Sequence, residues 1–67
     1  MDKYQIAIGI AELTIEKNGN PSIKDFLERG LATSEGQALE WVIRMSTKSS
    51  ESLVDGARKV LECYSAD

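Results

Sequence analysis

Three polar stretches, at residues 18–21, 30–33 and 46–50, divide the chain into four short segments. They concentrate the glycine, asparagine, proline, serine and threonine residues that end helices and form turns. The segments between them carry apolar residues at helical spacing, and none approaches the run of about 20 apolar residues that a membrane span needs. This division predicts an all-α protein, a small bundle of three to four short helices at about residues 3–17, 21–29, 34–46 and 50–64.

The second segment has the clearest predicted boundaries. Asn20 suits the N-cap and Pro21 suits the first helical position, because proline has no N–H to leave unpaired there. Gly30 suits the left-handed residue after the helix, and it places Leu31 against the last apolar turn in a Schellman stop. The segment therefore predicts a helix over residues 21–29.

The third segment contains the only tryptophan of the chain. Ser34, followed three residues later by Gln37, matches a capping box, with Thr33 as the alternative cap. Trp41 and Met45 belong to an apolar arc that covers roughly 200° of the helical wheel, about twice the width of one core face. Part of this helix is therefore expected to do more than pack against the core.

The fourth segment reads as a surface helix capped by Ser49 or Ser50. Its apolar residues fall within about 120° of the wheel, which is the width of a single buried face. Gly56 lies in the helix interior, where it costs up to about 1 kcal/mol relative to alanine. The glycine predicts a close crossing with another helix at this point.

The first segment is compatible with two structures. Residues 4–10 alternate between large apolar and small or polar side chains, as in a strand. The run continues to Glu16 without a turn, however, and its polar residues fall on one side of a helical wheel, so we predict a helix. Its apolar residues cover about 220° in two lobes. The lobe that contains Tyr4, Ile8 and Ile15 exceeds what a small monomeric core requires.

The chain has 67 residues, one cysteine and no histidine. We expect residues 1–67 to form a single small helical domain, and a domain this small buries only about 60% of its unfolded surface. Disulfides, metals or partner subunits often stabilise such chains. One cysteine cannot form an internal disulfide, and a zinc site that uses histidine is excluded. Of the three, oligomerisation is the one that remains available to stabilise the fold. We expect no metal or cofactor.

No residue pattern predicts catalysis. The absence of histidine excludes Ser/His and Cys/His nucleophilic pairs. Cys63 is placed near the negative end of a helix dipole, which disfavours the thiolate, and we interpret it as a half-buried small residue. Glu12 and Glu16 are most simply a solvated helix face. The glycines match no phosphate-binding loop. We therefore expect a protein that is not an enzyme.

The charge distribution argues against nucleic acid as a partner. Eight basic and eleven acidic residues give a net charge of −3, and the cations are spread along the chain rather than forming a basic stripe. One alternative is a small dimeric DNA-binding transcriptional regulator. It would be either a helix-turn-helix protein that reads bases with Ser34 and Gln37, or a ribbon-helix-helix protein with residues 4–10 as its strand.

The surplus apolar surface instead predicts a small interaction or regulatory protein. Trp41 is interpreted first as a core anchor, and the alternative is an interface anchor, because tryptophan is enriched at binding hot spots. We expect the partner to be a second copy in a homodimer, another protein, or both. The predicted interface residues are Tyr4, Ile8, Ile15, Trp41 and Met45.

The N-terminus shows no secretory signal pattern, because no basic region precedes an uninterrupted apolar stretch with a small-residue cleavage site. We therefore expect a cytoplasmic protein that does not enter a membrane. The small size and the free thiol are typical of a small bacterial or phage protein.

Overall fold

A computed structural model describes residues 2–64 and contains four helices and no strand in that range. They are α1 (Lys3–Glu16), α2 (Ile23–Glu28), α3 (Glu35–Ser46) and α4 (Ser50–Tyr64). The all-α prediction is confirmed, and the strand alternative for residues 4–10 is wrong. Of the helices described, none has the length and apolar character needed to cross a membrane.

Local capping explains why the first segment is a helix. The Asp2 side chain accepts a hydrogen bond of 2.9 Å from the backbone N–H of Gln5 and so caps the N-terminus of α1. At the other end, Asn18 and Gly19 both have positive φ, and the Gly19 N–H donates to the Thr14 carbonyl at 2.8 Å. This is the bond that closes a Schellman stop. These caps stabilise a helix, so the period-two alternation of side chains over residues 4–10 does not produce a strand.

The predicted start of the second helix is wrong by two residues. The helix begins at Ile23, and Ser22 rather than Asn20 is its N-cap. The Ser22 hydroxyl accepts from the Asp25 N–H at 3.2 Å, while the Asp25 carboxylate accepts from the Ser22 N–H at 2.8 Å. This capping box satisfies two backbone donors, whereas Asn20 would have satisfied one. Pro21 therefore lies outside the helix.

The predicted end of α2 is confirmed. Gly30 has a φ of +69°, and its N–H donates to the Leu27 carbonyl at 3.1 Å. The Leu31 N–H donates to the Phe26 carbonyl at 2.9 Å, which completes the Schellman motif. Leu31 is buried as a result. The turn thus directs a leucine from the α2–α3 connection into the core.

Serine caps both later helices. The Ser34 hydroxyl accepts from the Gln37 N–H at 3.2 Å and starts α3. The Gln37 side chain reaches back to the Thr33 N–H at 2.7 Å, so the box is offset by one residue from the prediction. The Ser49 hydroxyl accepts from the Ser52 N–H at 3.2 Å and starts α4. Of the predicted alternatives, the structure therefore selects Ser34 and Ser49.

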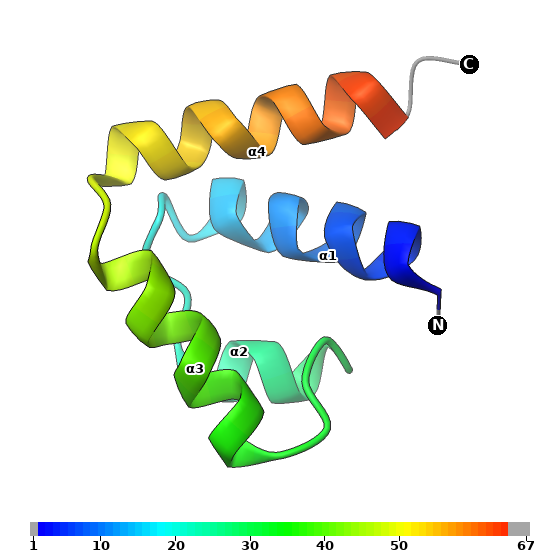
Figure 1. Cartoon of the computed structure of the whole chain (residues 1–67), viewed down its shortest axis with the longest axis vertical. Coiled ribbons are helices and arrows are strands. Elements are labelled where there is room, and N and C mark those ends of the chain that lie inside the picture. Colours follow the sequence, from blue (N-terminus) through cyan, green and yellow to red (C-terminus); the bar gives the residue numbers. More distant parts are fainter. Residues whose placement is uncertain (1, 65–67) are drawn as a thin grey trace.

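The core lies between α1, α2 and α3, and α4 packs antiparallel against α1 (Figure 1). Gly9 allows α1 to approach the α2–α3 connection, because a Cβ atom there would lie 2.6 Å from a methyl carbon of Leu31. α4 buries Val54 and Ala57. The central buried cluster consists of Leu13, Phe26, Leu31, Ala32 and Ala38.

The α2 capping box predicts an acid-sensitive contribution to stability. The hydrogen bond from the Ser22 N–H, supported by Lys17 at 3.7 Å, holds the pKa of the Asp25 carboxyl below its ordinary value of 3.8. A carboxyl whose pKa is lower in the folded state stabilises the fold above the unfolded pKa. This contribution is lost as the pH falls through the folded pKa.

We expect Asp25→Asn, which keeps an acceptor oxygen but removes the charge, to lose less stability than the parent when the pH falls below about 3.8. The measurement is thermal unfolding followed by circular dichroism at a series of acidic pH values. Parallel pH dependence in the two proteins would contradict this role of Asp25.

Candidate functional site

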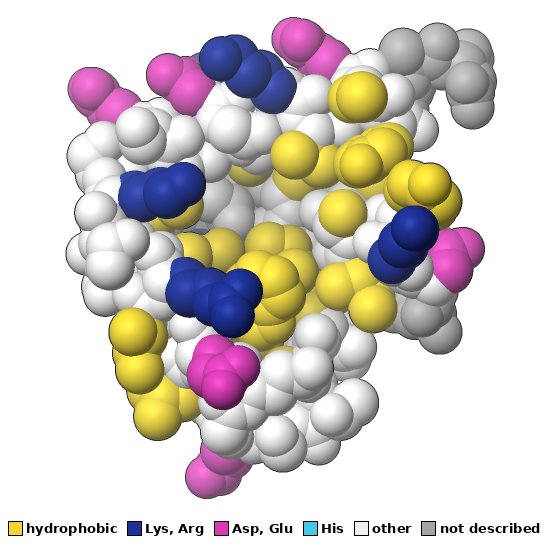
Figure 2. All heavy atoms as spheres, in the orientation of Figure 1, with side chains coloured by type: hydrophobic (Ala, Val, Ile, Leu, Met, Phe, Trp, Pro, Cys, Tyr) yellow, Lys and Arg dark blue, Asp and Glu magenta, His cyan; other side chains and the backbone are white. Residues whose placement is uncertain are grey.

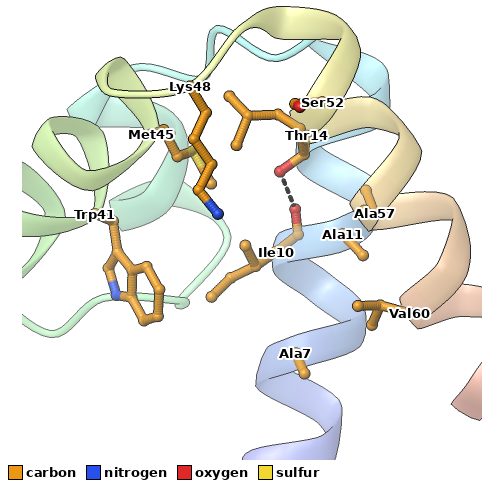
Figure 3. A pocket seen from close by; sticks show the side chains of 12 residues that line it. Ala7, Ile10, Ala11, Thr14, Trp41, Met45, Lys48, Ser52, Ala57 and Val60 are labelled. Atoms are coloured by element: carbon orange, nitrogen blue, oxygen red, sulfur yellow. Dashed lines mark hydrogen bonds between the residues drawn. The ribbon is translucent and has the colours of Figure 1, made fainter.

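An open apolar groove lies between α3 and α4, with α1 as its floor (Figure 3). Its volume is about 360 Å³. α1 contributes Ala7, Ile10, Ala11 and Thr14, the α3 side contributes Trp41, Met45 and Lys48, and α4 contributes Ser52, Leu53, Gly56, Ala57 and Val60.

Small side chains on two of the three helices leave this space open. Ala7 and Ala11 lie one turn apart on α1, and Gly56 and Ala57 lie together on α4. A Cβ atom at Gly56 would meet no atom within 4 Å. The close helix crossing predicted at Gly56 is therefore wrong. This glycine lines empty space, and the close approach on α1 occurs at Gly9 instead.

The α3 wall of the groove is formed by Trp41 and Met45, which are spaced one turn apart. Both are half-buried and pack against the central buried cluster while also lining the groove. The Arg44 guanidinium carbon lies 5.7 Å from the centre of the Trp41 ring, within the range of a cation–π contact. The two interpretations of Trp41 are thus compatible: one part of the side chain packs against the core and another faces the groove.

The other three predicted interface residues are not among those that line the groove. Tyr4 is 52% exposed, and its ring centre lies 5.3 Å from that of Tyr64 in an edge-on arrangement. Ile8 and Ile15 are half-buried on the same side of α1. This side faces α4, so α4 covers part of the α1 lobe that the sequence marks as surplus.

Sequence reasoning missed the contribution of α4 to the site. It treated the apolar face of this helix as hidden, but Leu53 and Val60 are only partly buried and line the groove. The signal that would have located the groove is the set of small residues on facing helices, Ala7 and Ala11 on one side and Gly56 on the other. Small side chains on adjacent helices leave a hollow unless another element fills it.

The outer face of α3 accounts for the rest of its wide apolar arc. Leu39 and Ile43 are 45% and 54% exposed. Their positions on the helix place them opposite Trp41 and Met45, on the side away from the groove. α3 therefore carries two distinct apolar surfaces rather than one broad one.

The groove has few polar groups. The Thr14 hydroxyl donates to the Ile10 carbonyl at 2.7 Å, so it does not present an unpaired donor to the groove. The Lys48 side chain extends across the groove between Trp41 and Ile10 (Figure 3). No carboxylate lines the groove among the residues that the structure describes. The site therefore offers apolar contact and one cationic group.

The other chemically active side chains lie outside the groove. Cys63 is exposed, not half-buried as predicted. Glu12 and Glu16 are exposed, as predicted, and Glu16 forms an ion pair with Arg29. Within residues 2–64, no three His, Cys, Asp or Glu side chains are close enough to hold a metal ion.

Hydrophobic side chains gather in a central hollow on the face shown in Figure 2, and both Lys or Arg and Asp or Glu side chains stand around it. The hollow combines an apolar lining with a partly basic border. This combination distinguishes it from the smaller and more polar depression near the α1–α2 connection, lined by Gly19, Asn20 and Ser46 among others.

Comparisons with protein-family models, with curated proteins and with solved structures find no match to this chain. The function is therefore argued from the groove itself.

Proposed function

We propose that this is a small, non-enzymatic interaction protein that binds a helix of a partner protein in the groove between α3 and α4. The observation that carries this proposal is the open apolar lining around Trp41 and Met45. Apolar side chains left facing solvent in a concave site gain free energy when another apolar surface covers them. An amphipathic helix laid into such a groove is a common recognition mode.

The dimensions of the groove suit a short helical segment. The α4 wall extends from Ser52 to Val60, which corresponds to about 12 Å along the helix axis. This is the length of about two turns of a partner helix. Such a segment presents three apolar anchors at positions i, i+3 or i+4, and i+7. Leu53 and Met45 are flexible enough to adapt to anchors of different shape.

A different protein suits the groove better than a second copy does. A two-fold dimer that joined groove to groove would bring Arg44 and Lys48 of both copies into one interface, where their like charges repel. If Leu39 and Ile43 of a second copy entered the groove instead, each copy would use two opposite faces of α3. Such a head-to-tail contact tends to continue into open chains rather than to close.

DNA binding has weaker support. In a helix-turn-helix arrangement, Ser34 and Gln37 would read bases, but both side chains are engaged in the α3 cap. Glu35 and Glu40 are exposed on the same helix, where they would repel phosphates. The ribbon-helix-helix alternative requires a strand within residues 4–10, which are helical.

We include a cytoplasmic location in the proposal. The only cysteine of the chain, Cys63, is exposed and free. A lone exposed thiol suits a reducing compartment, because disulfides are favoured outside it.

Filling the groove tests the proposal. Gly56→Leu places a large side chain into open space, and replacing glycine in a helix interior is not expected to destabilise α4. We expect this variant to bind a model amphipathic helical peptide at least about tenfold more weakly than the parent. The peptide contains leucine anchors and no tryptophan, so the fluorescence of Trp41 reports binding.

Gly36→Leu is the matched control, because it adds the same side chain to the outer face of α3. We expect its peptide affinity to equal that of the parent. Equal binding by the parent and Gly56→Leu would refute the groove as the binding site. A dimer of the parent, measured by sedimentation, that Gly56→Leu dissociates would instead refute the different-protein partner, because the occupant of the groove would then be a second copy.

A further inference from the structure

The eight cations of the chain fall into two groups of four. The first group forms ion pairs on the protein surface: Lys17 with Asp25, Lys24 with Glu28, Arg29 with Glu16, and Arg58 with Asp55. The second group, which we call the free cations, forms no ion pair with any residue that the structure describes. It consists of Lys3, Arg44, Lys48 and Lys59.

Two of the free cations lie at the groove. Lys48 lines it, and Arg44 lies over the ring of Trp41 at its wall. Lys3 and Lys59 are not among the residues that line it. The Lys3 ammonium instead lies 5.3 Å from the centre of the Tyr4 ring.

This arrangement opposes the overall charge of the protein. The net charge is −3, yet no described carboxylate lines the groove. Glu12 and Glu16 of α1 lie on the face of the helix away from Ile10 and Thr14. Four cations outside the groove are paired with carboxylates, whereas Arg44 and Lys48 at the groove form no ion pair with a described residue.

We infer that the partner helix is acidic: it carries Asp or Glu residues beside its apolar stripe, with two of them about one helical turn apart. This inference rests on the proposed function and specifies the partner's chemistry. Arg44 lies in the last turn of α3 and Lys48 lies just beyond the end of that helix, so two carboxylates about one turn apart on a helix lying along α3 would reach both cations. The apolar stripe then supplies most of the affinity, and the charges select the partner and its orientation.

A helix fits the observations better than an anionic membrane surface. The apolar residues form a concave groove, which a flat bilayer cannot enter, and the net charge of −3 opposes the approach of the protein to anionic headgroups. Vesicle binding is nevertheless a measurable alternative.

The test uses three helical peptides of about 18 residues that share the same leucine anchors and lack tryptophan. They differ only at the positions beside the apolar stripe, which hold Glu, Gln or Lys. Binding is followed by titration against Trp41 fluorescence at low and high salt. We expect the Glu peptide to bind about tenfold more tightly than the Gln peptide at low salt, and the Lys peptide to bind most weakly. High salt should reduce these differences.

Charge reversal on the protein provides the second readout. The double variant Arg44→Glu and Lys48→Glu should reverse the order, so that the Lys peptide binds most tightly. The control variant, Lys24→Glu and Arg58→Glu, changes the net charge by the same amount at cations that do not line the groove. The control variant should bind the Glu, Gln and Lys peptides in the same order of affinity as the parent.

The outcomes separate the two proposals. If the three peptides bind equally, and Gly56→Leu still blocks them, the acidic partner is wrong while the helix-binding groove stands. If Gly56→Leu blocks none of them, the proposed function itself is wrong. Binding to phosphatidylglycerol vesicles that is lost on Arg44→Glu and Lys48→Glu, together with equal binding of the peptides, would replace the acidic helix with an anionic membrane surface.

Discussion

Phe26→Ala is expected to remove a large part of the free energy of unfolding of the protein. Phe26 is fully buried at the centre of the core, between α1, α2 and α3. Truncating a buried phenylalanine to alanine costs about 3–5 kcal/mol, because apolar contact is lost and a cavity remains. A chain of 67 residues has a free energy of unfolding of only about 3–10 kcal/mol. The measurement is chemical denaturation followed by circular dichroism.

Ile43→Ala is the control for this experiment, because Ile43 is 54% exposed on the outer face of α3. We expect it to change the unfolding free energy by no more than about 0.5 kcal/mol. Phe26→Leu, which keeps most of the apolar volume, should fold and lose an intermediate amount. Equal losses for Phe26→Ala and Ile43→Ala would show that the core is not centred on Phe26.

Gly19→Ala should lower stability by more than Gly30→Ala does. Both glycines have positive φ, at +84° and +69°, and alanine in this region costs about 1–2 kcal/mol. At Gly19 the new Cβ atom would also lie 2.9 Å from the Cα atom of Ser50, which is backbone and cannot rotate away. Overpacking of this kind adds about 1–3 kcal/mol.

Gly30→Ala measures only the cost of alanine at positive φ, because a Cβ atom there would meet no atom within 4 Å. The difference between the two variants therefore measures how closely the α1–α2 connection approaches the start of α4. It is obtained from urea denaturation curves of both variants and the parent. Equal destabilisation would mean that this approach is absent.

The number and approximate position of the helices were predictable because their signals are local. Caps, Schellman glycines and helical spacing each involve residues within about one turn. The wrong start predicted for α2 arose because two local capping signals compete there. Asn20 and Pro21 formed a plausible start, but the reciprocal bonds of Ser22 and Asp25 satisfy more backbone donors. The sequence allowed both starts, and the better-satisfied one formed.

The candidate site was predictable only in part. Trp41 and Met45 were identified because the apolar arc of their helix is too wide for one core face. Their partners across the groove were missed, because apolar width on one helix does not show which helix stands opposite. For the same reason, Tyr4, Ile8 and Ile15 were predicted to exceed the needs of the core, because the sequence does not show that α4 packs against α1.

The sequence by itself indicated three to four short helices and their approximate bounds, and it determined that neither a disulfide within the chain nor a histidine site supports them. Only the tertiary structure decided which apolar surfaces meet and which stay open. Gly9 and Gly56 illustrate this. Both lie inside a helix, but a Cβ atom at Gly9 would meet Leu31, whereas a Cβ atom at Gly56 would face empty space. A residue's own type sets what it contributes to its helix, whereas the space around it depends on residues distant in the chain.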